Sequence, residues 1–166
     1  MLDLETLSNH SNAVIVTVAA VKFSFDSDET ETFCMNVNPR ESKELGLHIS
    51  QDTLQWWREQ DPAATKAWMH SQNSLGETLD AFDEFIGDPN LTHWAYGACF
   101  DFPIMDSSYR ALNRAAPWKY YKLLCARTII SLSKVDPRKE PRVGVYHNAV
   151  DDCLTQIANL KKALGK

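Results

Sequence analysis

Hydrophobic and polar residues alternate along the first forty positions in a pattern typical of β-strands. Residues 1–6 form a short apolar segment, Ala13–Phe25 is rich in β-branched residues, and Glu31–Asn38 alternates between apolar and polar side chains. The connections are short, and Asp26–Asp28 has a composition typical of a turn. We therefore predict an antiparallel β-meander of three strands.

Helical signals dominate the middle of the chain, after a polar segment behind Pro39 that we expect to be a loop. Ser50 is a suitable N-cap for one helix, and Pro62 is favourable in the first turn of the next. The residues Ser74–Glu77 fit a capping box, and apolar residues follow them at helical spacing. These signals predict three helices.

Strands and helices alternate in the remainder of the chain. Leu91–Gly97 and Leu123–Ala126 are expected to be strands, the residues near Asp101–Asn113 a helix, and the residues directly after Ala126 another helix. A proline-containing loop over Val135–Tyr146 leads to a last helix from about Asn148 to Leu164. Its expected buried stripe consists of Ala149, Cys153, Ile157, Leu160 and Leu164.

Length and composition agree with one domain over residues 1–166. The chain is 44% hydrophobic and 23% charged, as in ordinary globular proteins. A meander followed by alternating helices and strands predicts an α/β domain with a mixed five-stranded sheet flanked by helices. No run of about 18 apolar residues occurs, so no membrane span is expected. The four cysteines form no C-x-x-C pair, which favours the reducing cytoplasm over a disulfide framework or a zinc site.

The charges are distributed unevenly along the chain, whose formal net charge is −5. Residues 110–142 hold nine Lys and Arg against two acidic residues, a local charge of +7 that leaves −12 for the rest. Trp118, Tyr120 and Tyr121 lie within this stretch. Basic residues interleaved with aromatic ones suit a single strand of nucleotides, and a solvated basic face is the alternative interpretation.

Three acidic motifs follow one another in the sequence. Asp3 and Glu5 are two residues apart on the first expected strand, Asp101 follows a later strand, and Asp152 stands five residues after His147. Residues i and i+2 of a strand share a face, so the first two carboxylates can bind one cation. Converging carboxylates need cations to stay ionised, and oxygen ligands suit Mg²⁺ or Mn²⁺. The acidic motifs therefore predict a metal site.

The order D-x-E, D and H-x-x-x-x-D resembles that of the DEDDh 3′→5′ exonucleases, which have an RNase H-like fold. The matching segments are DLETL at 3–7, YGACFDFP at 96–103 and HNAVDDC at 147–153. The tract DTLQWWREQDPAA at 52–64 is similar to one branch, the small exoribonucleases related to phage exodeoxyribonuclease DexA. The resemblance extends over nearly the whole chain.

The resemblance implies a 3′→5′ exonuclease that uses two Mg²⁺ or Mn²⁺ ions. Its substrates would be the 3′ ends of single-stranded or 3′-overhanging RNA or DNA, RNA more readily than DNA, and its products nucleoside 5′-monophosphates. The general base of the family corresponds to His147, and its spacing selects Asp152 rather than Asp151 as the last ligand. The implied metal ligands are Asp3, Glu5, Asp101 and Asp152.

Six further residues are expected to bind substrate: Thr6, Leu7, Trp57, Arg138, Lys139 and Arg142. Backbone groups near Thr6 and Leu7 would hold the terminal 3′ hydroxyl. The position of Leu7 in the family wedges against the terminal base, and a buried loop leucine is the alternative. Trp57 would stack on a base or belong to the core, whereas Trp56 is expected in the core.

Other functions are compatible with the same fold. A small-molecule phosphodiesterase or nucleotidase would not need the extended basic stretch at 110–142. A non-catalytic nucleic-acid-binding relative would lack one of the five family residues, and all five are present. Relatives of this branch are often dimers, so the basic stretch could instead form a homodimer interface.

Overall fold

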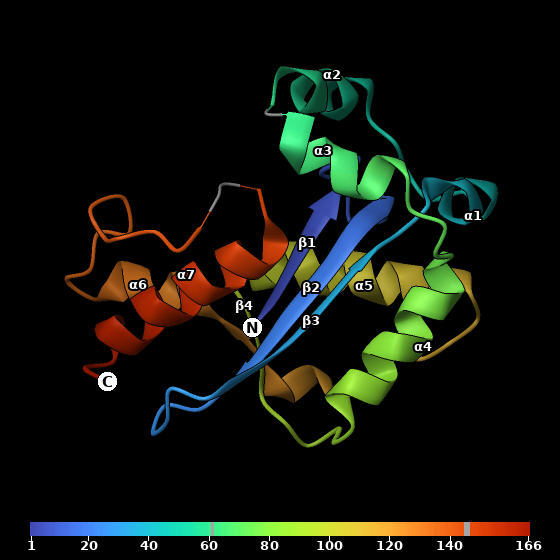
Figure 1. Cartoon of the computed structure of the whole chain (residues 1–166). Helices are drawn as coiled ribbons and strands as arrows, with labels where there is room; N and C mark the ends of the chain where they lie inside the picture. Colours follow the sequence, from blue (N-terminus) through green and yellow to red (C-terminus); the bar gives the residue numbers. More distant parts are fainter. Residues whose placement is uncertain (61, 145–146) are drawn as a thin grey trace.

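The chain folds around one mixed β-sheet, which confirms the predicted α/β class. The computed structural model describes residues 1–60, 62–144 and 147–166 (Figure 1). Within these residues the strand order is β3-β2-β1-β4-β5. The first three strands are antiparallel neighbours, and the last two run parallel to β1. The strands are β1 (Leu2–Thr6), β2 (Ile15–Phe23), β3 (Thr30–Asn36), β4 (His93–Ala95) and β5 (Leu123–Cys125).

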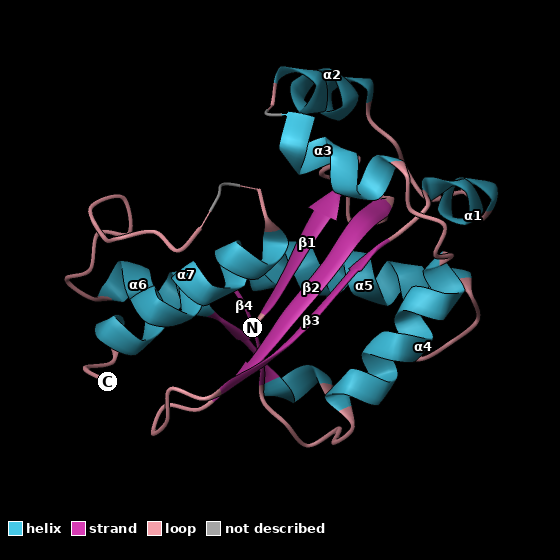
Figure 2. Cartoon of the chain, in the orientation of Figure 1, coloured by secondary structure: helices cyan, strands magenta, loops and turns pink. Residues whose placement is uncertain are grey.

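Helices cover both faces of this sheet (Figure 2). They are α1 (Pro39–Glu44), α2 (Gln51–Glu59), α3 (Pro62–Met69), α4 (Leu75–Ile86), α5 (Ala98–Ala111), the 3₁₀ turn η1 (Tyr120–Lys122), α6 (Ala126–Leu132) and α7 (Ala149–Ala163). Helix α7 packs on β1, β2 and β3 with α6 beside it, whereas α5 contacts β1, β4 and β5. None of the described helices is long and apolar enough to cross a membrane.

The short strand β1 separates two hydrophobic cores. Its side chains alternate, so Leu2 and Leu4 enter the larger core together with residues of α4 and α5. A smaller core forms on the other side, where Cys153 and Ile157 of α7 pack with Ile130 of α6. The acidic side chains of β1 therefore point toward the α7 side of the sheet.

Two expectations about elements are wrong. The segment after Pro39 is the short helix α1 rather than a loop, because Asn38 caps it by accepting the Arg40 N–H. Leu164 does not belong to the buried stripe of α7, because the helix ends at Ala163 and Leu164 is 45% exposed. The expected loop over Val135–Tyr146 is confirmed as far as residue 144, and its last two residues lie outside those that the structure describes.

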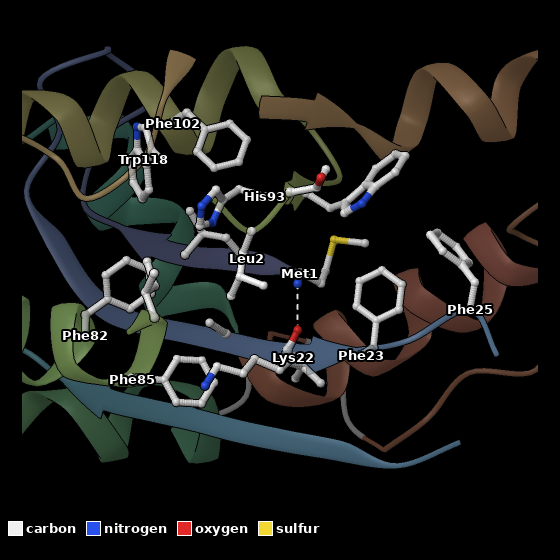
Figure 3. Close-up of a pocket in the computed structure, with 16 residues that line it drawn as sticks. Met1, Leu2, Lys22, Phe23, Phe25, Phe82, Phe85, His93, Phe102 and Trp118 are labelled. Atoms are coloured by element: carbon white, nitrogen blue, oxygen red, sulfur yellow. Dashed lines mark hydrogen bonds between the residues drawn. The ribbon is translucent and has the colours of Figure 1, made fainter. Parts of the chain in front are cut away.

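Aromatic side chains surround a cavity of about 170 Å³ beside the start of β1 (Figure 3). Phe82 and Phe85 of α4 face Phe102 of α5 and Trp118 across it, and the Lys22 ammonium lies 4.6 Å from the centre of the Phe85 ring. None of the acidic residues predicted to bind metal lines this cavity. Residues of both hydrophobic cores line it, so the cavity lies apart from the predicted site.

Candidate active site

Strand β1 presents Asp3 and Glu5 on one face, as its alternating pattern predicts. Opposite them on β2 stand Ala19 and Thr17, which are small enough to leave space above the sheet. Both carboxylates are half-buried under α7. The strand thus holds two acidic side chains at a fixed spacing, directed into a confined space.

Helix α7 brings the third carboxylate to this space. The Asn148 side chain caps the helix by accepting the Val150 and Asp151 N–H groups, and Asp152 lies in its first turn. Asp3, Glu5 and Asp152 each place a carboxylate oxygen within 4.8 Å of the others. The structure therefore brings together three of the four predicted metal ligands.

Asp101 enters the same site from the first turn of α5, which follows β4 directly. Its side chain is 6% exposed, and burial raises its pKa to about 7, while hydrogen bonds from the Leu4 and Gly97 backbone amides counteract this rise. Asp101 lies outside the group of three, yet its charge raises the pKa of both Asp3 and Glu5. It is therefore placed at the edge of the carboxylate cluster.

The carboxylates repel one another in the metal-free protein. Burial, followed by the charges of Asp101 and Asp152, raises the pKa of Asp3 well above its usual range, although a hydrogen bond from Gln156 opposes this shift. Burial and the charges of Asp3, Asp152 and Asp101 raise the pKa of Glu5 to about 9. Bound cations would relieve this repulsion.

The donor atoms fit divalent metal ions that prefer oxygen. Besides the carboxylates, the site contains Gln156, which lies one helical turn after Asp152. The Gln156 Nε2 donates to Asp3 Oδ1 at 2.7 Å. The Gln156 Oε1 is buried and has no hydrogen-bond partner among the described residues, so it can accept from a water on a bound cation. Sequence reasoning missed Gln156, although its i+4 spacing from Asp152 was a usable signal.

Arg142 contacts this carboxylate cluster directly. Its guanidinium contacts Asp152 Oδ1 at 2.5 Å, and both side chains are 19% exposed. The other two predicted basic residues lie apart: Arg138 and Lys139 are more than 80% exposed, and both pair with Asp136. Of the three expected phosphate contacts, the structure places only Arg142 beside the carboxylates.

His147 lies in the segment that leads into α7, against two tryptophans of α2. Its ring meets Trp56 and Trp57 edge to face, with centroids 4.9 and 6.1 Å apart. Its φ of 61° is in the left-handed region, where histidine is found more often than most non-glycine residues. The Trp57 indole donates to Thr6 O at 2.9 Å, so the tryptophans and His147 adjoin the end of β1.

The structure places Trp57 in the core, one of its two expected environments, and overturns the expectation that Trp56 is a core residue. Trp57 is 4% exposed and packs in the large core, whereas Trp56, which was expected in the core, is 40% exposed. The spacing of Leu54 and Trp57 explains this result, because residues three apart share one face of a helix and Leu54 also packs on the core. Trp56 is thus the tryptophan available for stacking.

Thr6 and Leu7 are largely engaged within the protein. Leu7 is 3% exposed, its N–H donates to Val14 O, and its carbonyl accepts the Ser50 N–H. The Thr6 hydroxyl donates to Ser8 O. These contacts favour the alternative interpretation of Leu7 as a buried loop leucine and leave its backbone groups occupied.

Comparisons with known proteins find nuclease relatives. The chain is 24% identical to the exodeoxyribonuclease of Enterobacteria phage T4, over 99% of this chain and 88% of the phage protein. The crystal structure of cell-death related nuclease 4 superposes with a TM-score of 0.68 at 15% identity. That likeness, which indicates an RNase H-like fold, covers 99% of this chain but only 62% of the nuclease. Residues 1–164 match the family model of the 3′–5′ exoribonuclease Rv2179c-like domain, and the chain therefore belongs to this exonuclease family.

Proposed function

We propose that this protein is a metal-dependent 3′→5′ exonuclease that releases nucleoside 5′-monophosphates from single-stranded or 3′-overhanging ends. The observation that carries the proposal is the convergence of Asp3, Glu5 and Asp152, whose oxygens lie within 4.8 Å of one another. Asp101 adds a fourth carboxylate at the edge of this cluster. Membership of an exoribonuclease family supports the same reaction.

The donor set would hold two Mg²⁺ or Mn²⁺ ions. Glu5 and Asp152 would hold one ion, and Asp101 would hold the other. Asp3 would contribute to holding both ions. When bound, the ions supply an activated water and stabilise the charge of the scissile phosphate and the leaving 3′ oxygen.

The remaining groups would position the substrate and move a proton. A neutral imidazole of His147 can accept a proton from the attacking water. Arg142, already beside Asp152, offers its guanidinium to a phosphate oxygen. Trp56 exposes an aromatic face next to His147, on which a terminal base can stack.

RNA is the proposed preferred substrate, and the cytoplasm the proposed compartment. The family description specifies an exoribonuclease, whereas the phage relative is an exodeoxyribonuclease, so the sugar preference needs a direct comparison. All four cysteines are free, which agrees with a reducing compartment.

The test compares RNA and DNA of the same sequence, each as a linear and as a circular single strand, in the presence of Mg²⁺. We expect the linear RNA to be shortened stepwise from its 3′ end, the linear DNA more slowly, and both circles to persist. Cleavage of the circles at the rate of the linear strands would contradict the exonuclease. Binding of RNA without hydrolysis would indicate a non-catalytic nucleic-acid-binding protein. Hydrolysis of a small phosphodiester but of no RNA or DNA would indicate a small-molecule phosphodiesterase.

A further inference from the structure

A second aromatic surface lies outside the candidate active site, in the 3₁₀ turn η1. Tyr120 and Tyr121 are 84% and 61% exposed, and their rings meet edge to face with centroids 5.4 Å apart. Within the described part of the chain, neither tyrosine hydroxyl forms a hydrogen bond, and neither ring belongs to a hydrophobic core. Two adjacent large aromatic side chains in solvent indicate a binding surface more often than they serve packing.

These tyrosines line an open groove of about 580 Å³ together with cations from the end of α5 and the segment behind it. Arg110 and Lys119 are exposed, and neither has a carboxylate within 4.0 Å among the described residues. Arg114, by contrast, is held by Asp80 and Asp83. Lys119 donates to Asn90 Oδ1 and interacts electrostatically with Asp88, so the groove presents two positive charges outside direct ion pairs beside two aromatic rings.

The carboxylate content of the groove is low. Asp106 is the only acidic residue among those that line it, and its Oδ1 accepts the Trp118 indole N–H at 3.2 Å. This contrasts with the whole chain, whose formal net charge is −5. The groove is therefore complementary to a polyanion, although the protein as a whole is acidic.

We propose that this groove is a second nucleic-acid-binding surface, which holds a distant part of the single strand whose 3′ end lies at the carboxylates. Unpaired cations attract phosphates, and exposed tyrosines stack on bases of any sequence. The inference rests on the proposed nuclease function, because it assigns the ligand of the groove to the class of that substrate.

Helix α5 connects the two places. Asp101 lies in its first turn and Arg110 in its last, nine residues apart, which corresponds to about 13 Å along the axis. A short strand that fills only the candidate active site would not reach the groove, whereas a longer strand would contact both. The groove should thus make affinity depend on substrate length.

The experiment measures the binding of labelled single-stranded RNA by fluorescence anisotropy, with Asp3→Asn in every protein to prevent degradation. We expect the double variant Tyr120→Ala/Tyr121→Ala to weaken binding of a strand of about 20 nucleotides by at least about fivefold. Binding of a strand of about four nucleotides should stay within about twofold of that of Asp3→Asn alone. Tyr120→Phe/Tyr121→Phe should retain the affinity, because phenylalanine keeps the stacking face.

The charges are tested separately through the salt dependence of binding. Arg110→Ala/Lys119→Ala should lower the slope of log K against log salt by about 1.4 for the long strand, because each single-strand phosphate contact contributes about 0.7. Lys43→Ala and Leu132→Ala, at exposed positions away from the groove, serve as controls and should change nothing.

Equal affinity of the tyrosine variant and Asp3→Asn alone for the long strand would overturn the proposal. If the variants instead dissociate a dimer in sedimentation experiments while RNA affinity is unchanged, the groove joins two copies of the chain, and the proposal is also wrong. Failure of the proposed nuclease function would be distinguishable, because the unsubstituted protein would then leave even short RNA intact in Mg²⁺.

Discussion

At the scale of single residues, the two tryptophans of α2 have separable roles. Trp57→Ala should lower the free energy of unfolding by about 3–5 kcal/mol, because it removes a buried ring and the hydrogen bond to Thr6 O. Trp56→Ala should change it by less than about 1 kcal/mol and should weaken RNA binding. Urea denaturation and RNA titration of both variants check this. Equal loss of stability in both variants would contradict the assignment.

Gln156 is predicted to orient Asp3 for metal binding. Gln156→Leu keeps the size of the side chain but removes the donor to Asp3 Oδ1, so Mg²⁺ affinity should fall by about 10- to 100-fold. Isothermal titration with Mg²⁺ in the absence of substrate measures this change. Parent-like Mg²⁺ binding by Gln156→Leu would remove Gln156 from the site.

The placement of individual side chains was predictable where a periodicity fixes their direction. Strand alternation places Asp3 and Glu5 on one face, and the order of the motifs, together with the family resemblance, selects Asp152. The contacts of Gln156 and Arg142 were not predictable in this way, because they depend on how α7 and the preceding loop approach β1.

At the scale of elements, α7 is the helix on which the site depends. Asn148 caps it through two backbone N–H groups, and Asp152 and Gln156 follow within two turns. Asn148→Ala should lower the free energy of unfolding by about 1 kcal/mol and reduce hydrolysis as well, because fraying of the first turn displaces Asp152. Thermal denaturation and RNA hydrolysis measure both effects. Asn148→Asp should preserve the cap, and an Asn148→Ala variant with parent stability and rate would contradict this role.

Elements with a clear apolar stripe were predictable, and elements without one were not. Helix α4 has a capping box formed by Ser74 and Glu77 and buries Leu79, Phe82 and Ile86 on one face. Helix α1 is six residues long, and its PRESKE sequence contains no apolar stripe. The Asn38 cap stabilises it instead, together with a hydrogen bond in which Glu41 Oε2 accepts the Gly76 N–H. This hydrogen bond depends on tertiary structure, because Gly76 belongs to α4.

At the scale of the whole molecule, the carboxylate cluster should make the stability of the metal-free protein depend on pH. The pKa of Glu5 is raised from 4.5 to about 9, so its protonated form favours the folded state. The resulting contribution is fully present below pH 4.5 and is lost as the pH rises toward about 9. In EDTA, Glu5→Gln should therefore be more stable than the parent at pH 8, and the difference should vanish near pH 4.

Thermal denaturation of parent and Glu5→Gln across this pH range measures the difference directly. Mg²⁺ should raise the stability of the parent at pH 8 to at least that of Glu5→Gln, because bound cations stabilise the ionised carboxylates. A stability difference that is constant with pH would show that Glu5 is not in a repulsive cluster. The comparison between two proteins cancels the titration of groups elsewhere in the chain.

The order of the strands was predictable only in part. Short connections between the first three strands indicate an antiparallel meander, which the structure confirms. That β4 lies beside β1, with Leu2 paired to Ala95, cannot be read from local periodicity, because 86 residues lie between the end of β1 at Thr6 and the start of β4 at His93.

The most direct test of the central claim is the hydrolysis of 5′-labelled single-stranded RNA as a function of Mg²⁺ concentration, for the parent and for Asp3→Asn. Asp3 is the carboxylate that contacts Gln156 and whose pKa responds to both Asp101 and Asp152. The account predicts a Mg²⁺-dependent ladder of products from the parent, no products in excess EDTA, and a rate at least about 10²-fold lower for the folded Asp3→Asn variant. Undiminished hydrolysis in EDTA, or by Asp3→Asn, would contradict it.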